Sequence, residues 1–382
     1  MKSAISKKRT TNLLILLLLC AIWFAIGWLA CTWRLDTEVK LVEQVRRVLL
    51  NEHLGQVPTS RALSYAAIRG MLREIGDPHT ALLEPEVSRR FQADFAGESG
   101  VIGLFTERQG GHMVATVVFP GEPAYEAGVR QGDIILSIDG VAIDEDTADA
   151  EVILLVRGPV GAPAHIQVQR GDEILDFYPV RHERPIVSSR MLPGGIAYVA
   201  QYTFTSNAGP KMKAALEELL AQQPKALIWD LRSNGGGSMD TAQEILSYFV
   251  KDGLLFMAER NDGKLKRYVA TGDAIAGDIP LVVLVSGRTY SAAETAAVTI
   301  GERDRGTVIG DTTYGKGTIQ AFYPLAGNAT LQTTVARWLG PSGTWYGERG
   351  VSPEIAVSDD EGTAEDEVQQ YAVEYLLTNL AP

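Results

Sequence analysis

The chain has 382 residues, more than one ordinary hydrophobic core usually organises, so its length predicts two or three domains. Its hydrophobic content of 46% can supply those cores, and its net charge of −12 argues against a nucleic-acid partner, which needs a broad basic surface. Cysteine occurs only at Cys20 and Cys31, which excludes disulfides and thiolate sites from Thr32 onward. The histidines lack metal-ligand spacing, so we expect no metal and no cofactor.

A basic and then apolar stretch begins the chain. Lys2, Lys7, Lys8 and Arg9 precede an uncharged run of 18 residues from Leu13 to Ala30. This run is just long enough to span a bilayer, so we expect an uncleaved single-pass anchor in the cell membrane. The positive-inside rule then places the body of the protein outside the cytoplasm, in a periplasmic or extracellular location.

Two alternatives to the anchor remain open. A cleaved signal peptide also begins with basic residues and an apolar run, although its apolar region is usually shorter. The residues before Cys31 faintly resemble a bacterial lipoprotein cleavage site, but Trp28 and Leu29 are poor occupants of its first two positions. The sequence therefore favours an anchor over cleavage and over lipidation.

After the anchor, apolar residues recur at helical spacing and are followed by a β-rich texture. Helices are predicted from Leu41 to Leu54 and from Arg61 to Ile75, with Gly76-Asp77-Pro78 ending the second. Residues 94–180 then show short alternating strands with turn signals. The segments Phe119 to Gly128 and Gly132 to Gly140 resemble the helix and strand pattern of PDZ domains.

A PDZ module implies a site for the C-terminus of a peptide. Such modules add the peptide to a sheet as an extra strand and hold its carboxylate on backbone N–H groups of a glycine-containing loop. The corresponding positions here are Val101, Ile102, Gly103 and Leu104. Alone, this short loop is better read as an ordinary turn before a strand, but the downstream pattern favours peptide binding.

Beyond residue 184, strands and helices alternate, which predicts an α/β domain with parallel strands. The fold class is therefore mixed α/β and β, with an N-terminal transmembrane helix and a small helical segment before the PDZ-like module. The predicted domains are 1–33 (cytoplasmic basic end and anchor), 34–93 (helical segment), 94–180 (PDZ-like module), 181–358 (α/β core) and 359–382 (acidic linker and C-terminal helix).

Within the predicted core, Ser291 and Lys316 form a candidate nucleophile and base. A serine hydroxyl needs a neighbouring base to attack a carbonyl, and serine–lysine pairs are known variants of the catalytic triad. Ser291 follows a strand and begins a helix, while Lys316 lies between two glycines with no charged residue beside it. If residues 316–320 are extended, Gln320 lies on the same face as Lys316 and orients its amine.

A glycine run supplies the remaining part of such a site. Gly236 and Gly237 allow the backbone to approach a scissile carbonyl closely. An N–H group from one of them, together with that of Ala292 at the helix start, predicts an oxyanion hole.

Each half of the pair has a competing interpretation. Ser291 and Glu294 fit a capping box, in which the serine only caps its helix. Gly310 to Lys316 matches most of a phosphate-binding loop, but Gly317 replaces the Ser or Thr that holds magnesium, and a strand rather than a helix is predicted to follow. The complete constellation favours a nucleophile and sets the phosphate loop aside.

The order of these motifs, over roughly residues 60–355, resembles the carboxy-terminal processing proteases, also called tail-specific proteases. The matches include Gly76 to Thr80, Leu155 to Gly161, Asp230 to Gly237, Ser291 to Glu294 and Gly315 to Gln320. This resemblance implies a serine endopeptidase with Ser291, Lys316 and Gln320 in its catalytic site. Three positions depart from the family pattern: Ser286 replaces an asparagine, Tyr290 a residue that is often small, and Ala293 a common serine.

The predicted function is therefore cleavage of protein or peptide substrates near exposed C-terminal tails that the PDZ module binds. The alternative is a catalytically silent scaffold, in which the PDZ module alone binds peptide C-termini and Ser291 caps a helix. The joint presence of Ser291, Lys316 and Gln320 disfavours the scaffold. Oligomeric state, substrate identity and whether the PDZ module recruits or inhibits are left open.

Overall fold

The computed structural model describes residues 18–24, 37–145, 147–359 and 365–379. The chain divides into two compact units, Met1–Ile75 and Gly76–Pro382. Residues 18–24 are helical, while the remainder of the predicted anchor and the basic residues before it lie outside the described residues. Among the described helices, none has both the length and the apolar character that a membrane span requires.

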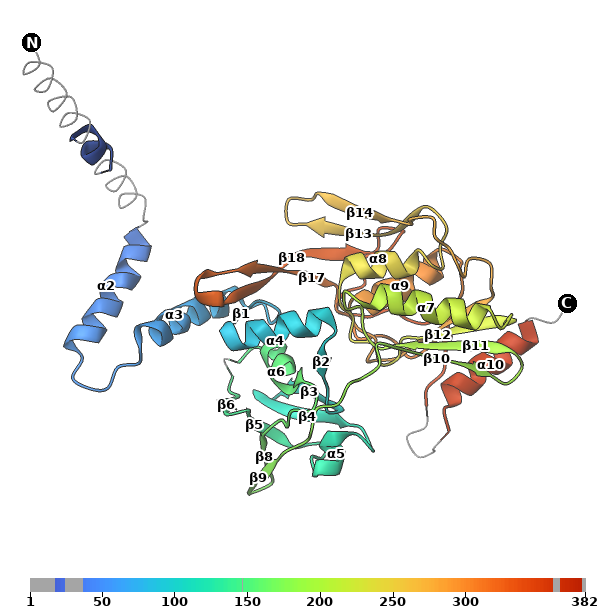
Figure 1. Cartoon of the computed structure of the whole chain (residues 1–382), viewed down its shortest axis with the longest axis horizontal. Helices are drawn as coiled ribbons and strands as arrows, with labels where there is room; N and C mark the ends of the chain where they lie inside the picture. The colour runs from blue at the N-terminus through green and yellow to red at the C-terminus, as the bar shows by residue number, and fades with distance from the viewer. Residues whose placement is uncertain (1–17, 25–36, 146, 360–364, 380–382) are drawn as a thin grey trace, which may run out of the picture. The chain divides into compact units, whose positions relative to one another are not determined.

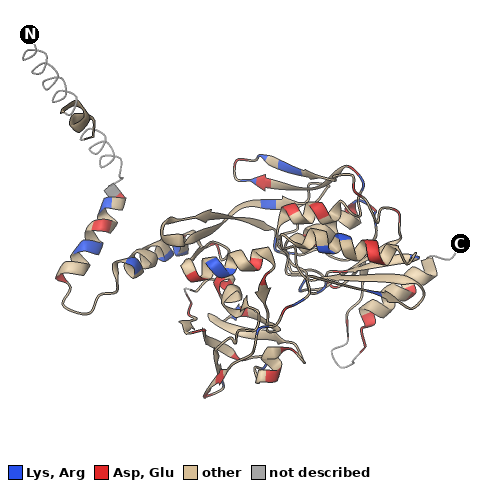
Figure 2. Ribbon diagram, in the orientation of Figure 1, with Lys and Arg blue, Asp and Glu red and all other residues tan. Residues whose placement is uncertain are grey.

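The first unit contains two helices where the sequence predicts them. They are α2 (Thr37–Glu52) and α3 (Ser60–Ile75). Acidic and basic side chains alternate along α2 (Figure 2), where Arg46 and Arg47 lie 2.7 and 3.0 Å from carboxylate oxygens of Glu43. Such exposed pairs are screened by solvent and contribute little to stability.

The second unit begins with a β-rich module. Its sheet has the order β3-β4-β5-β8-β9, with every pair antiparallel, and β3 lies at one edge. The strands are β3 (Leu104–Gln109), β4 (His112–Val118), β5 (Ile134–Ile138), β6 (Val141–Ala142), β8 (Ile166–Arg170) and β9 (Glu173–Phe177). Two further short strands, β2 (Ser99–Gly100) and β7 (Gly158–Pro159), pair with each other.

Helices α5 (Pro123–Ala127) and α6 (Asp149–Val156) complete this module. A preceding helix, α4 (Pro85–Ala96), shares its buried core, because Val87 packs in the same cluster as Ile102 and Leu155. Part of the predicted helical segment 34–93 thus contributes to the core of the β-rich module.

An α/β core follows, built on a sheet of order β10-β11-β12-β15-β16-β19. Its strands are β10 (Val187–Leu192), β11 (Ile196–Gln201), β12 (Ala226–Asp230), β15 (Leu281–Val285), β16 (Thr307–Gly310) and β19 (Ile355–Ala356). All pairs are parallel except β10 with β11. Strands β12 and β15 are buried at every residue, as expected of parallel strands covered on both faces.

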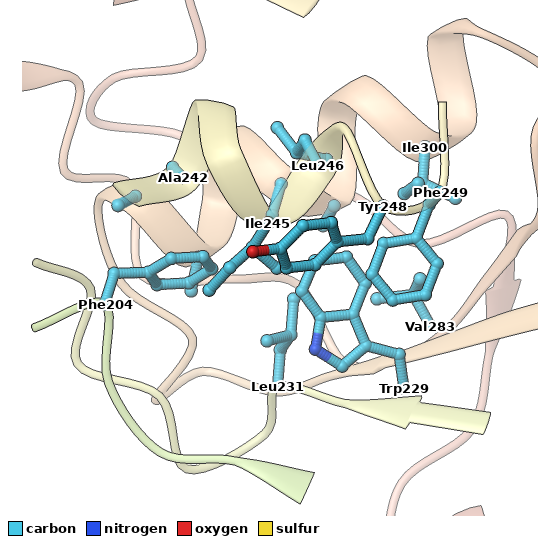
Figure 3. Close-up of a cluster of buried hydrophobic side chains, with 14 of the residues drawn as sticks. Phe204, Trp229, Leu231, Ala242, Ile245, Leu246, Tyr248, Phe249, Val283 and Ile300 are labelled. Atoms are coloured by element: carbon cyan, nitrogen blue, oxygen red, sulfur yellow. The ribbon is translucent and has the colours of Figure 1, made fainter. Parts of the chain in front are cut away.

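Helices cover both faces of this sheet. Helices α7 (Ala208–Leu220), α8 (Met239–Leu246) and α9 (Ala292–Glu302) pack in one buried cluster, and α10 (Glu367–Asn379) packs in another. Figure 1 shows α10 on the side of the sheet opposite α7 and α8. The first cluster centres on Trp229, whose ring stacks on Phe249 at 4.5 Å (Figure 3). Its indole N–H donates to Gln201, so this buried polar group is satisfied.

A second sheet in the core carries the predicted lysine segment. It has the order β1-β18-β13-β14, with β17 also paired to β18. The strands are β1 (Ala81–Leu83), β13 (Leu254–Arg260), β14 (Leu265–Val269), β17 (Thr318–Pro324) and β18 (Thr330–Leu339), and a 3-10 turn η1 (Ala326–Asn328) joins β17 to β18. Because the residues after Lys316 form a strand, the phosphate-loop interpretation does not apply.

A cluster of ion pairs fixes the C-terminal part of the chain to the core. The guanidinium of Arg232, directly after β12, lies 2.7 Å from a carboxylate oxygen of Asp230 and 2.7 Å from one of Asp366. Asp359 lies at 3.2 Å from the same group. Only 13% of the Arg232 side chain is exposed, so these charges interact through protein more than through water. The acidic linker and α10 are therefore tied to the loop that leaves β12.

The fold thus has the predicted mixed α/β and β architecture, with a β-rich module before the α/β core.

Candidate active site

The predicted site lies where two neighbouring parallel strands end. Strands β12 and β15 pair directly, with Asp230 opposite Leu284, so the loops that follow them lie side by side. Hydrogen bonds join the two loops: the hydroxyl of Thr289 donates to the carbonyl of Leu231 at 2.9 Å, and the N–H of Tyr290 donates to the carbonyl of Asn234 at 3.0 Å. The loop after β12 and the loop after β15 are therefore joined to each other by hydrogen bonds.

Ser291 has a strained backbone. Its φ is 55° and its ψ is −116°, a region that residues with a side chain rarely adopt. A serine that merely caps a helix has extended backbone angles instead. Strain of this kind persists only when the surroundings hold it, and it gathers at functional sites, as in the nucleophile turn between a strand and a helix. The conformation favours the nucleophile interpretation over capping alone.

The carboxylate of Glu294 joins the serine to the lysine segment. Its Oε2 accepts the N–H of Ser291 at 2.7 Å and the N–H of Lys316 at 2.9 Å. Its Oε1 accepts the N–H of Gly315 at 2.6 Å and the hydroxyl of Thr313 at 2.6 Å. Burial raises the pKa of this carboxyl group, although its four donors act in the opposite direction. One buried side chain thus brings together two segments that are distant in sequence.

The backbone of Lys316 is fixed on both sides, because its carbonyl also accepts the indole N–H of Trp338 at 2.7 Å. Its Nζ lies 5.1 Å from the ring centre of Tyr290. Burial lowers the pKa of the amine to about 8, while the charges of Asp77 and Glu294 act in the opposite direction. The sequence neighbours of Lys316 are uncharged, as predicted, but these two carboxylates reach it from elsewhere in the fold. Neither forms an ion pair with it within the described part of the chain.

The two glycines of the predicted oxyanion hole differ in whether their N–H groups are already hydrogen-bonded. The N–H of Gly236 donates to the side-chain oxygen of Asn234 at 2.8 Å, so it is already engaged. A Cβ atom on Gly236 would lie 2.9 Å from the Cβ of Ser291, which explains why only glycine fits there. Over the described residues, the N–H groups of Gly237 and Ala292 donate to no protein acceptor. The assignment of an oxyanion hole to these two groups stays a prediction.

Gln320 makes different contacts from those that alternation predicts. Its side-chain amide donates to the hydroxyls of Thr318 and Thr334 at 3.0 and 3.2 Å. The hydrogen bond to the amine of Lys316 is not formed among the described residues. A β-bulge between Ile319 and Gln320 shifts the register against β18 at this point. Whether Gln320 orients the amine during catalysis stays a prediction.

In the β-rich module, the predicted carboxylate loop has two free donors. The N–H of Val101 is engaged, because it donates to the carbonyl of His182 at 3.0 Å. The N–H groups of Ile102 and Gly103 donate to no protein group in the described part of the chain. Leu104 then begins β3, an edge strand that pairs only with β4. The loop with its two N–H groups and the edge strand are the two parts that peptide binding by strand addition requires.

Comparison with known proteins agrees with this geometry. Residues 195–357 match the model of peptidase family S41, and residues 114–170 match that of the PDZ domain. The chloroplastic C-terminal processing peptidase of Tetradesmus obliquus is 33% identical over 321 residues, which cover 78% of this chain and 69% of that protein. The chain belongs to the carboxy-terminal processing proteases.

Two further similarities extend across most of this processing protease. The carboxy-terminal processing protease CtpB of Bacillus subtilis (strain 168) is 29% identical over 331 residues, covering 84% of this chain and 68% of that protein. The solved structure of the photosystem II D1 C-terminal processing protease superposes with a TM-score of 0.64 and 29% identity. That superposition covers 85% of this chain and 89% of the other. The family consists of serine peptidases, so the chain is a serine-type peptidase.

The structure of this processing protease adds residues to the site that sequence reasoning did not assign a role. Asp77 accepts the N–H of His79 at 3.0 Å and the hydroxyl of Thr80 at 2.5 Å, and its charge acts on Lys316. Burial, and then the charge of Lys316, lowers the pKa of His79. The available signal was the motif Gly76 to Thr80, which the sequence analysis noted only as part of a resemblance.

One departure from the family pattern has a structural role in this processing protease. The hydroxyl of Ser286 donates to the carbonyl of Arg232 at 2.7 Å and accepts the N–H of Arg288 at 3.1 Å. It therefore links the loop after β12 to the loop after β15. Ala293, the departure on α9, is fully buried in the large core cluster, where a methyl group packs without an unsatisfied hydroxyl.

Proposed function

We propose that this protease cleaves protein substrates near their C-terminal tails, with Ser291 as nucleophile and Lys316 as base. The observation that carries the proposal is the shared Oε2 of Glu294, which accepts the N–H groups of both residues. The strained backbone of Ser291 and the lowered pKa of Lys316 support it, because an exposed serine and an ordinary lysine would need neither.

The reaction proceeds through an acyl-enzyme. The neutral amine of Lys316 takes the hydroxyl proton while the Oγ of Ser291 forms a bond to the scissile carbonyl carbon. The resulting negative oxygen accepts the N–H groups of Gly237 and Ala292. As the carbon–nitrogen bond breaks, the lysine passes its proton to the leaving amine. Lys316 then takes a proton from water, whose oxygen attacks the ester carbon. As the bond from this carbon to the Oγ of Ser291 breaks, Lys316 returns the proton to Oγ, and the released carboxylic acid loses its own proton to solvent.

The PDZ module supplies the tail-binding site. An extended tail adds to the edge strand β3, and its terminal carboxylate binds the free N–H groups of Ile102 and Gly103. At the other end of β3, Arg108 forms an ion pair with Asp149 of α6 at 3.0 Å. Burial, and then the charges of Glu107 and Asp149, raises the pKa of Tyr314. Since Tyr314 is two residues before Lys316, a tail that runs along β3 is led towards the serine.

The cellular placement follows from the N-terminus. We propose that the apolar run from Leu13 to Ala30 anchors the chain in the cell membrane, with the basic residues inside and the protease outside the cytoplasm. The substrates are then extracytoplasmic proteins with exposed, unstructured C-termini. Mass spectrometry of the membrane-extracted protein decides whether this segment is retained, cleaved or lipidated.

The catalytic proposal is tested with the full chain in detergent and a folded reporter that ends in an unstructured tail. We expect Ser291→Ala and Lys316→Ala each to lower kcat/KM by roughly 10³-fold or more, because both act on the same reacting atoms. Lys266→Ala is the matched control, since Lys266 also contacts a tyrosine ring but lies exposed on β14. Cleavage by Ser291→Ala at the wild-type rate overturns the proposal.

A further inference from the structure

The side chain of Tyr290, directly before the nucleophile, is not used by the mechanism above. Its backbone is fixed, because its N–H donates to Asn234 and its carbonyl accepts the N–H of Ala293 at 3.1 Å. A Cβ on Gly236 would lie only 2.6 Å from that carbonyl oxygen, so the glycine loop closes against it. The side chain therefore has little choice of direction, and its ring lies 5.1 Å from the Nζ of Lys316.

A second ring covers the first. The centres of the Tyr290 and Tyr314 rings are 4.4 Å apart, with planes tilted by 46°. The N–H of Tyr314 donates to the carbonyl of Thr289 at 3.1 Å, which joins the two segments that carry the rings. The Tyr314 residue is 50% exposed, whereas Tyr290 is less exposed. The two rings thus pack as a layer beside the amine of Lys316, and Tyr314 is the more exposed of the two.

Such a layer has two opposite effects on an amine. The face of an aromatic ring attracts an ammonium group and favours the protonated form, whereas exclusion of water favours the neutral form. The charged groups that face Lys316 are Asp77, Glu294 and His79. Both carboxylates already accept hydrogen bonds from N–H and hydroxyl groups, so neither is an ion-pair partner of the amine. Water exclusion is therefore the effect that decides.

The same chain contains a comparison. Lys266 lies 4.2 Å above the ring of Tyr268, a closer contact than that of Lys316 with Tyr290. There partial burial lowers the pKa, but hydrogen bonds with Tyr268 and Asp240 outweigh it, and the pKa is raised. A tyrosine ring alone does not neutralise a lysine. Lys316 differs from Lys266 because it is largely buried and the rings of Tyr290 and Tyr314 lie beside it.

We propose that Tyr290, covered by Tyr314, is a positioning residue that keeps water from the Lys316 amine. This inference rests on the proposed roles of Ser291 and Lys316. It gives a function to a position where the sequence departs from the pattern of its family, in which a small residue is common. A small residue there would leave the amine open to water unless another group covered it.

The test measures how fast a fluorophosphonate probe labels the full chain between pH 6 and 10. This probe reacts with an activated serine and does not require a tail bound to the PDZ module. For the wild type we expect labelling to rise with pH and to reach half of its maximum near pH 8, because only the neutral amine acts as a base. Ser291→Ala gives the background.

Tyr290→Ser removes the ring and admits water. We expect the midpoint to move up by about one pH unit, with roughly tenfold slower labelling at pH 7 and an unchanged plateau at high pH. Tyr290→Phe keeps the ring and keeps the midpoint. Tyr314→Ala, at a half-exposed position, moves the midpoint in the same direction by a smaller amount. Tyr371→Ser, an exposed tyrosine on α10, is the control for a lost hydroxyl and ring.

The outcomes separate the two proposals. If the wild type is labelled but Tyr290→Ser and Tyr314→Ala keep its midpoint, or lower it, the positioning role is overturned while the catalytic pair stands. If the wild type shows no labelling above Ser291→Ala at any pH, both fail. Circular dichroism of each variant shows whether it is folded. Should Tyr290→Ser not fold, Tyr314→Ala decides alone.

Discussion

At Ser291, the strained backbone and the buried carboxylate of Glu294 depend on each other. A residue with positive φ costs on the order of 1–3 kcal/mol and persists only where its surroundings fix it. Here the fixing contact is the N–H of Ser291, held at 2.7 Å by the same oxygen that holds Lys316. This capping-box glutamate therefore also holds the backbone of the proposed nucleophile next to that of the proposed base.

Replacement of Glu294 by glutamine tests this role. Glutamine keeps the shape but offers one acceptor oxygen and places an NH₂ group against two of the four donors. We expect Glu294→Gln to lower the free energy of unfolding by about 2–3 kcal/mol and fluorophosphonate labelling by roughly 10²-fold. Thermal unfolding and labelling rates measure the two effects.

Glu302→Gln is the matched control for this change. Glu302 lies at the other end of α9 and also accepts several hydrogen bonds, including the N–H of Ser342 at 2.6 Å and the hydroxyl of Tyr346 at 2.5 Å. We expect this variant to lose stability but to keep its labelling rate. Equal losses of labelling in both variants would show that Glu294 acts only through general stability.

At the scale of elements, the strands and helices of the core could be predicted because their apolar patterns are strong. Strands Ala226–Asp230 and Leu281–Val285 are continuous apolar runs, and the start of α8 follows its capping serine, Ser238. The position of Ser291 between strand and helix follows from the same patterns. Local sequence was therefore sufficient to predict these strands and helices, because interactions between neighbouring residues determine them.

The parts of the site that could not be predicted depend on contacts between distant segments. The β-bulge before Gln320 arises from the pairing of β17 with β18, so alternation within β17 could not reveal it. Asp77 reaches Lys316 because β1 pairs with β18. The N–H of Gly236 is engaged by a side chain that folds back from Asn234. Sequence spacing gives candidates for such contacts but not their partners.

The PDZ loop gives a prediction at this scale. With the uncleaving Ser291→Ala variant, a peptide with a free C-terminal carboxylate should bind at least tenfold more tightly than its amidated form, because the free N–H groups favour a negative charge. Gly103→Ala should abolish this preference, since φ at Gly103 is +73° and a Cβ would lie 2.2 Å from the Cβ of Glu122. Fluorescence anisotropy measures both affinities.

The control for the loop is Gly110→Ala, at the turn after the same strand, where φ is also positive but no atom lies within 4 Å of the added Cβ. It bears the same backbone strain without the collision. A peptide that binds Gly103→Ala and the wild type alike, or prefers its amidated form, would contradict the assignment of Ile102 and Gly103 as the carboxylate site.

At the scale of the whole molecule, Arg232 connects the C-terminal segment to the catalytic loops. The guanidinium is 13% exposed and pairs with Asp230, Asp359 and Asp366. Removal of one partner from such a buried cluster leaves unpaired charge and costs about 3–5 kcal/mol. The loop that carries Gly236 and Gly237 follows directly after Arg232. We therefore expect a change at Arg232 to affect the N–H groups proposed for the oxyanion hole.

We therefore expect Arg232→Gln to lower the free energy of unfolding by about 3 kcal/mol and to speed amide hydrogen exchange in α10. Hydrogen exchange followed by mass spectrometry locates the change. Arg190→Gln is the control, because Arg190 also contacts α10, at Gln369, but from an exposed position. If α10 exchanges no faster in Arg232→Gln than in Arg190→Gln, the ion pairs do not hold the helix.

The docking of α10 bears on how accessible this segment is to proteolysis. Residues Glu367–Asn379 form α10, and Val368, Ala372 and Leu376 are buried against the sheet. A helical backbone cannot pair with the edge strand of a sheet. A protease that binds its substrate as an added strand therefore cannot take up this stretch while it stays docked.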